Sequence, residues 1–177
     1  MKTHGPIVIT GFMGCGKTGV ARKLAELLNL EVVDLDEAIT EREGRSAARL
    51  ISEDGEKAFR EIETEALRDV LKSGPIRIIA LGGGAWIERA NRVLIDQNRG
   101  MSVWLDTPFG TCWERIEISG DDRPLGRDRE QARELYERRR PIYQLANIRI
   151  EAGPEKSLDD LASRIEAEIV EAKLPRK

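Results

Sequence analysis

Short apolar runs alternate with amphipathic stretches along most of this chain. Five apolar runs have the length and composition of buried β-strands, and they cover residues 6–10, 31–35, 76–81, 102–105 and 147–151. In the stretches between them, apolar residues recur every three or four positions, which is the spacing of one buried helix face. These stretches predict helices at residues 17–28, 37–43, 46–51, 55–71, 91–98, 109–116, 129–138, 141–146 and 157–173.

The order of these elements indicates an α/β fold. The strand at 6–10, the helix at 17–28 and the strand at 31–35 form a βαβ unit, whose crossover is right-handed and whose strands are parallel. A chain of 177 residues is long enough to bury a sizeable core. We therefore expect residues 1–177 to form a single three-layer α/β/α domain with a five-stranded parallel sheet.

Composition and charge narrow the possible classes of protein. Hydrophobic residues make up 40% of the chain and charged residues 34%, and no apolar run is long enough to span a bilayer. The first residues lead directly into a strand and leave no room for a signal peptide, so we expect a cytoplasmic protein that binds no membrane. The net charge of −3 argues against a nucleic-acid-binding protein. Three arginines at 138–140 share their segment with several glutamates, which favours pairing within the protein or solvation.

A glycine-rich segment follows the first strand, and it reads Gly-Phe-Met-Gly-Cys-Gly-Lys-Thr at residues 11–18. Between a strand and a helix, this pattern predicts a P-loop, whose backbone N–H groups surround a phosphate at the positive end of the helix dipole. Lys17 is then expected to reach the β- and γ-phosphates, and Thr18 to bind Mg²⁺ through its hydroxyl. A chance match would instead leave Lys17 as an ordinary surface lysine. The expected ATP-binding residues are Gly14, Cys15, Gly16, Lys17, Thr18 and Gly19.

The two cysteines, Cys15 and Cys112, are too few for a disulfide framework, and we expect both to be reduced thiols. Cys15 lies inside the predicted phosphate loop, where a helix N-terminus can lower the pKa of a thiol. Sensitivity to thiol reagents is therefore a hypothesis for this residue.

Two aspartates lie at the end of the second strand, at the sheet edge where α/β proteins bind ligands. In an extended segment, Asp34 and Asp36 project to the same side of the backbone. One carboxylate could hold Mg²⁺ through water or accept a proton, and the other could bind a substrate hydroxyl. For Asp36 alone, capping of the helix at 37–43 is an alternative, but it does not explain Asp34.

Three consecutive glycines, Gly82, Gly83 and Gly84, follow the third strand. A plain turn needs only one or two glycines, so we favour a close approach of the backbone to a ligand at this point. Residues 117–128 are rich in glycine and charge and have few side chains to bury. We expect this segment to form a mobile lid.

These segments together resemble the shikimate kinase family, P-loop enzymes of aromatic amino-acid biosynthesis. The resemblance runs from the P-loop to Ala146. Besides the P-loop, it is carried by Val33-Asp34-Leu35-Asp36, Gly55-Glu56, Phe59-Arg60-Glu61-Ile62-Glu63, Leu81-Gly82-Gly83-Gly84, Arg123-Pro124-Leu125 and Arg139-Arg140-Pro141-Ile142-Tyr143. It implies the strand order 2-3-1-4-5, similar to nucleoside monophosphate kinases, and transfer of a phosphoryl group from MgATP to the 3-hydroxyl of shikimate. Ile51 departs from the pattern, since the family commonly has an aromatic residue there.

The resemblance also implies roles for individual residues. Asp34 would hold Mg²⁺ through water, beside Thr18. Asp36 would bind ring hydroxyls and is the candidate base for the attacking hydroxyl. Arg60 and Arg139 would bind the carboxylate of shikimate, because arginine forks match carboxylates in geometry.

The remaining implied roles concern the glycine turn and two further arginines. Gly82 and Gly83 would offer backbone N–H groups to the substrate, and Gly84 would complete the turn. Arg123, in the predicted lid, would close over the substrate and the transferring phosphate, while Arg115 would lie against the adenine. The implied catalytic residues are Lys17, Asp36 and Arg123.

Two other functions fit part of the pattern. A related small-molecule kinase, such as a gluconate kinase, would share the P-loop and the lid, but the pair Arg60 and Arg139 fits a cyclic hydroxy acid better. A nucleotide-binding regulatory module without turnover would not need Lys17, Asp34, Asp36 and Arg123 together. The expected partners are therefore shikimate and ATP with Mg²⁺, and we expect a monomer.

Overall fold

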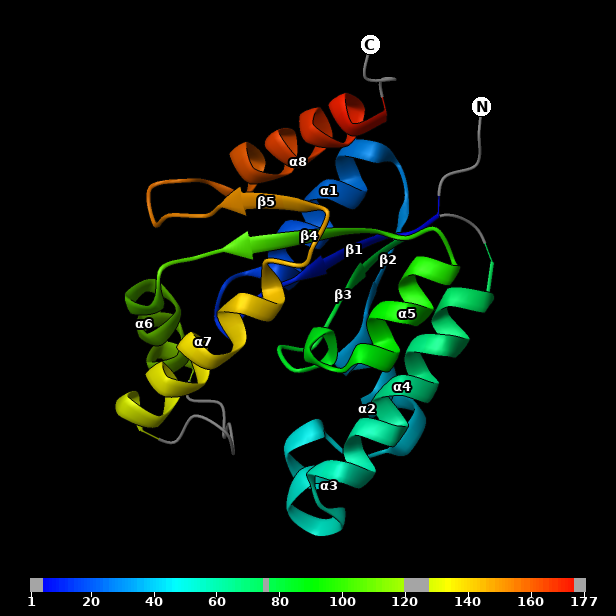
Figure 1. The fold of residues 1–177 in the computed structure, drawn as a ribbon, viewed down its shortest axis with the longest axis vertical. Helices are drawn as coiled ribbons and strands as arrows, with labels where there is room; N and C mark the ends of the chain where they lie inside the picture. The colour runs from blue at the N-terminus through cyan, green and yellow to red at the C-terminus, as the bar shows by residue number, and fades with distance from the viewer. Residues whose placement is uncertain (1–4, 75–76, 120–127, 174–177) are drawn as a thin grey trace.

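The computed structural model describes residues 5–74, 77–119 and 128–173 of the chain. Its centre is a five-stranded parallel sheet with the strand order β2-β3-β1-β4-β5 (Figure 1), which confirms the predicted fold class and strand order. The carboxyl ends of parallel strands meet at one edge of the sheet. The strands are β1 (Ile7–Thr10), β2 (Glu31–Asp34), β3 (Arg77–Ala80), β4 (Met101–Asp106) and β5 (Ile148–Glu151).

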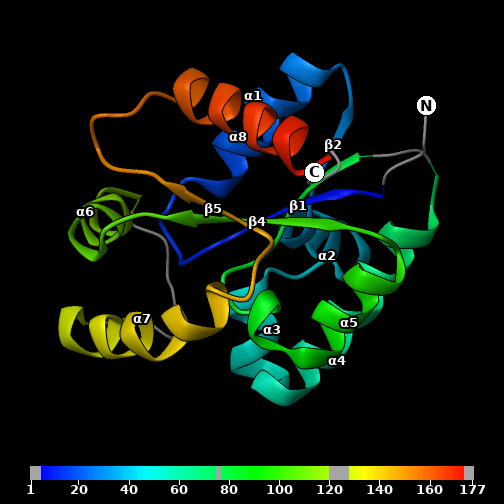
Figure 2. The same ribbon diagram turned by 45° about the horizontal axis from the view of Figure 1, so that its top comes forward.

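Helices cover both faces of the sheet and produce three layers. Figure 2 shows α1 (Lys17–Leu28) and α8 (Leu158–Lys173) on one face, with α4 (Glu56–Lys72) and α5 (Arg89–Gln97) on the other. No helix of the described ranges is long and apolar enough to cross a membrane. The remaining helices are α2 (Leu35–Glu43), α3 (Ala47–Asp54), the 3-10 helix η1 (Ala85–Ile87), α6 (Phe109–Ser119) and α7 (Arg129–Tyr143).

The central strands are apolar because helices cover them on both sides. Val8 and Ile9 of β1, Ile78 and Ile79 of β3, and Val103 of β4 are completely buried. Parallel strands that are buried on both faces appear in a sequence as continuous apolar runs rather than as alternating patterns. This explains why the short apolar runs located the strands to within a few residues.

Helix α7 differs from the sequence prediction, which placed a break before Pro141. The helix is continuous from Arg129 to Tyr143. Proline lacks the N–H of one helical hydrogen bond and disfavours helical backbone at the preceding residue. Pro141 lies in the last turn, so only two helical residues follow it, and an ion pair between Arg140 and Asp106 at 3.2 Å holds the preceding residue in place.

The bounds of other elements also differ from the sequence prediction. The 3-10 helix η1 was not predicted, and α2 begins at Leu35 rather than at residue 37. Of the segment 117–128, predicted as a lid, residues 117–119 belong to α6 and Asp128 caps α7, accepting from the Gln131 N–H at 2.8 Å. Residues 120–127, which include Arg123, lie outside the described residues.

Candidate active site

The segment between β1 and α1 has the backbone of a phosphate-binding loop. Gly11, Gly14 and Gly16 have φ angles of 147°, 75° and 94°, in the range that favours glycine. Gly16 directly precedes α1, so the loop ends at a helix N-terminus, whose N–H groups are suited to bind an anion. The Lys17 ammonium donates to the carbonyls of Gly11 at 3.0 Å and Phe12 at 2.8 Å, which places its charge beside the loop.

A pocket of about 310 Å³ opens in front of this loop. Thr18 Oγ1 donates to Asp34 Oδ2 at 2.6 Å, which joins the start of α1 to the end of β2. Arg115 of α6 lines the same pocket and donates to the Gly14 carbonyl at 3.4 Å. The pocket therefore combines backbone N–H groups, two cations and a hydroxyl–carboxylate pair.

Asp34 has a structural role that the sequence did not suggest, because its carboxylate caps α2. Asp34 Oδ1 accepts from the backbone N–H groups of Asp36 at 3.0 Å and Glu37 at 3.3 Å. Asp36 lies in the first turn of α2, so the prediction of two aspartates on one side of an extended segment is wrong. The alternative that Asp36 caps the helix is also wrong, since the helix begins two residues earlier than predicted.

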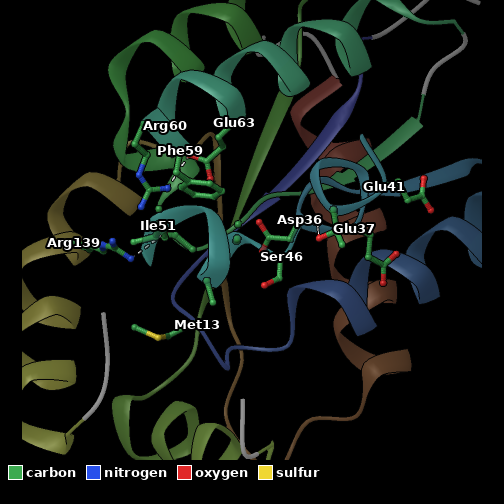
Figure 3. Close-up of a pocket in the computed structure, with 16 residues that line it drawn as sticks. Met13, Asp36, Glu37, Glu41, Ser46, Ile51, Phe59, Arg60, Glu63 and Arg139 are labelled. Carbon is green, nitrogen blue, oxygen red and sulfur yellow. Dashed lines mark hydrogen bonds and ion pairs between the residues drawn. The ribbon is translucent and has the colours of Figure 1, made fainter. Parts of the chain in front are cut away.

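A second pocket, of about 870 Å³, lies beside the first (Figure 3). Helices α2, α3, α4 and α7 and the glycine turn after β3 form its walls. Arg60 of α4 and Arg139 of α7 both line it, and Figure 3 shows their side chains on the same side of the pocket. Ile51, the position that departs from the family pattern, lines the pocket as well.

The two pockets are adjacent, and three residues line both of them: Met13, Asp36 and Gly83. The Asp36 carboxylate thus borders both the space in front of the phosphate loop and the space between the two arginines. A group that moves from one pocket to the other would pass beside this carboxylate. The site therefore has the arrangement that a transfer reaction between two bound molecules requires.

The glycine turn gives the polar side chains room at this junction. None of its three glycines has a left-handed φ, so their small size matters more than their flexibility. A Cβ at Gly82 would lie 2.7 Å from Asp36 Oδ1, and a Cβ at Gly84 would overlap the Arg60 guanidinium. The Gly83 carbonyl accepts from Arg139 Nη1 at 3.3 Å.

Glu63 is a site residue to which the sequence analysis gave no role. It is 1% exposed, and its Oε2 accepts from Arg60 Nη1 at 2.8 Å, while Arg60 Nη2 donates to Glu56 at 3.2 Å. Burial raises the pKa of Glu63 to about 7, although Arg60 acts in the opposite direction. The two glutamates hold the Arg60 guanidinium against the glycine turn.

A comparison with protein families finds a match to the shikimate kinase family over residues 13–170 of the chain. The chain belongs to the shikimate kinase family. The shikimate kinase of Cereibacter sphaeroides is 37% identical over 162 residues, which cover 90% of this chain and 79% of that protein. The shikimate kinase of Persephonella marina is 36% identical over 163 residues, 90% of this chain and 98% of that protein.

Solved structures of the family have the same fold. The shikimate kinase from Acinetobacter baumannii in complex with shikimate has a TM-score of 0.89 and 34% identity, covering 98% of this chain and 97% of that one. A gluconokinase from Sinorhizobium meliloti has a TM-score of 0.64 and 16% identity, a likeness that shows the fold alone. The gluconate kinase alternative is therefore less supported than the shikimate kinase family.

Three further residues of the sequence analysis, one arginine and two cysteines, lie outside the proposed catalytic set. Arg140 pairs with Asp106, as the intramolecular alternative for the arginine run proposed. Cys15 and Cys112 are both free and buried. Burial raises the pKa of Cys112 to about 12, so it is a poor nucleophile. Cys15 is 1% exposed, which limits the access of a thiol reagent.

Proposed function

We propose that this protein transfers the γ-phosphoryl group of ATP to the 3-hydroxyl of shikimate, giving shikimate 3-phosphate and ADP, as a step of aromatic amino-acid biosynthesis. The observation that carries the proposal is the junction at Asp36, where a phosphate-loop pocket meets a pocket lined by Arg60 and Arg139. The membership of the shikimate kinase family and the relative solved with shikimate support this choice of acceptor.

The larger pocket suits a small acid that carries hydroxyl groups. Arg60 and Arg139 come from different helices, and planar guanidinium groups bind a carboxylate through paired hydrogen bonds. The substrate carboxylate would lie between these two cations. The opposite end of the ring would then face Asp36 and the glycine turn, where carboxylate and backbone groups can bind hydroxyls.

Asp36 is proposed as the base for the attacking hydroxyl. Its carboxylate lies at the junction of the pockets, so a hydroxyl bound to it would point toward the phosphate-loop pocket. Phosphoryl transfer depends mainly on alignment and on neutralising charge. Lys17 would supply positive charge to the moving phosphoryl group. Arg123 is proposed to supply more, and it lies outside the described residues.

The residues around Thr18 and Asp34 fit a magnesium ion. The Thr18 hydroxyl and the Asp34 carboxylate are hard oxygen donors 2.6 Å apart, the type of ligand that Mg²⁺ prefers. Within the described ranges, no three His, Cys, Asp or Glu side chains gather as a metal site. The pair of Thr18 and Asp34 therefore suits Mg²⁺, an ion that takes its other ligands from water and phosphate oxygens. When bound, Mg²⁺ would neutralise charge on the β- and γ-phosphates.

Adenine is proposed to bind beside Arg115, whose guanidinium reaches the Gly14 carbonyl. Gly82 and Gly83 are proposed to offer backbone N–H groups to shikimate. A cytoplasmic location and a monomeric state stay predictions.

A coupled assay of ADP release tests the proposed function, with shikimate, quinate and gluconate as separate acceptors. We expect shikimate to stimulate ADP release strongly, because its ring carries a carboxylate for the arginine pair and hydroxyls for Asp36. Stimulation by gluconate alone would replace this proposal with the gluconate kinase alternative. Nucleotide binding without stimulation by any of the three acceptors would favour a regulatory module.

A further inference from the structure

Helix α7 runs from beside the phosphate loop to the acceptor pocket, and two buried tyrosines attach it, Tyr136 at its middle and Tyr143 at its C-terminal end. Tyr136 Oη donates to the Thr107 carbonyl at 3.0 Å, directly after β4. Tyr143 Oη donates to the Gly83 carbonyl at 2.5 Å, in the glycine turn after β3. The two tyrosines are seven residues apart, so they project from the same face of the helix.

Tyr136 contacts the phosphate loop in two ways. Its ring packs edge-on against Phe12 of the loop, with ring centroids 5.2 Å apart and an interplanar angle of 86°. Thr107, which accepts the Tyr136 hydroxyl, donates its own Oγ1 to the Cys15 carbonyl of the loop at 3.2 Å. A movement of Tyr136 would therefore be transmitted to the backbone that binds the phosphates.

Tyr143 is linked to the acceptor pocket in a similar way. It is buried, and the Gly83 carbonyl that it binds also accepts from the substrate-pocket residue Arg139. Trp86 Nε1 of η1 donates to the Ile142 carbonyl at 3.0 Å, which adds a second link between α7 and the segment after the glycine turn. The end of α7 and the glycine turn are thus held as one unit.

Both hydroxyls remain donors across the physiological pH range. Burial raises the pKa of Tyr136 to about 12, and it raises the pKa of Tyr143 further still. Between the two tyrosines, Arg140 pairs with Asp106 at the end of β4 and keeps the helix at a fixed distance from the sheet. The helix is therefore attached to the sheet edge at three points along its second half.

We propose that Tyr136 and Tyr143 are positioning residues that set the placement of the donor and acceptor pockets relative to each other. Tyr136 acts on the nucleotide through the phosphate loop. Tyr143 acts on the acceptor through Gly83 and Arg139. The inference rests on the proposed function, because it requires one substrate in each pocket.

The variants Tyr136→Phe and Tyr143→Phe test the inference, since each removes one hydroxyl and keeps the ring. Without the hydroxyl, the Gly83 carbonyl keeps only the Arg139 guanidinium as a side-chain donor and the Thr107 carbonyl only the Cys112 thiol, so each carbonyl can shift toward its remaining donor. We expect Tyr143→Phe to raise the KM for shikimate by about tenfold and to leave the KM for MgATP within about twofold. We expect Tyr136→Phe to show the opposite pattern. Each variant is the matched control for the other, because both tyrosines lie on α7 and each donates to one backbone carbonyl outside that helix.

A purely structural role would lower the thermal midpoint and change both KM values equally, or neither, and this result would overturn the inference. If Tyr143→Phe does not fold, Trp86→Phe removes the second link of the same unit and is expected to show the same selective rise in the KM for shikimate. An unselective change in that variant would also overturn the inference. The proposed function fails separately, when the unmodified protein does not phosphorylate shikimate.

Discussion

The buried carboxyl group of Glu63 leads to a specific prediction about how stability depends on pH. In the folded protein its pKa is about 7, whereas the ordinary value that applies to the unfolded chain is 4.5. Between these two values, the folded state holds a proton that the unfolded state has released. The free energy of unfolding therefore falls as the pH rises through this range, because stability decreases with pH wherever the unfolded state binds fewer protons. The contribution is complete below the unfolded pKa and is lost above the folded one.

The size of this effect follows from the shift in pKa. One pKa unit corresponds to about 1.4 kcal/mol, so the protonated Glu63 contributes about 3 kcal/mol that is lost above neutral pH. The chain has a single histidine, so few other groups titrate in the same range. We expect Glu63→Gln, which cannot ionise, to remove most of the decrease in the free energy of unfolding between about pH 5 and about pH 8.

Urea unfolding of both proteins at the two pH values measures this difference directly. Glu56→Gln is the matched control, because Glu56 also pairs with Arg60, at 3.2 Å, but its side chain is half exposed. This control is expected to keep the pH dependence of the unmodified protein. An equal decrease in the free energy of unfolding in the unmodified protein and in Glu63→Gln would refute the reasoning. So would the loss of this decrease in Glu56→Gln.

Three further predictions concern catalysis and acceptor binding. Asp36→Asn should lower kcat with shikimate by about 100-fold or more, which is the range for loss of a general base, and should leave the KM for MgATP nearly unchanged. A change in the KM for shikimate without a change in kcat would contradict the role of base. Gly84→Ala should raise the KM for shikimate by about tenfold and also lower the thermal midpoint, because the added Cβ displaces the Arg60 guanidinium from its pairing with the buried Glu63. Arg123→Ala should lower turnover far more than nucleotide affinity, as measured by steady-state rates and by ATP titration, whereas equal losses would exclude its predicted role at the transferring phosphate.

The elements that depend on local patterns could be predicted from the sequence. The central strands appeared as apolar runs because both of their faces are buried, and the phosphate loop appeared because its glycines have fixed spacing. The N-terminus of α2 was misplaced because Asp34 and Asp36 both have the side chain of a capping residue. Only the hydrogen bonds of Asp34 to two backbone N–H groups show which one begins the helix.

Glu63 shows where prediction of the site reached its limit. The structure buries Glu63 on the same face of α4 as Phe59, Ala66 and Leu67, a face that apolar spacing alone would leave to apolar residues. The arginine three residues earlier, Arg60, was the available signal, since charges at that spacing are neighbours on a helix. The role of Glu63 in the site depends on the approach of Asp36 and the glycine turn, which are distant from Glu63 in the sequence. The tyrosine contacts of α7 were missed for the same reason, and because Pro141 suggested two helices.

The measurement that tests the central claim most directly is the identity of the product. The unmodified protein is incubated with MgATP and shikimate, and the product is analysed by NMR that correlates the phosphorus with the ring protons. If the acceptor is held between Arg60 and Arg139 with one hydroxyl at Asp36, a single phosphate ester on the 3-hydroxyl should form in step with ADP. A phosphate on another hydroxyl, or ADP without any phosphorylated shikimate, would contradict the account.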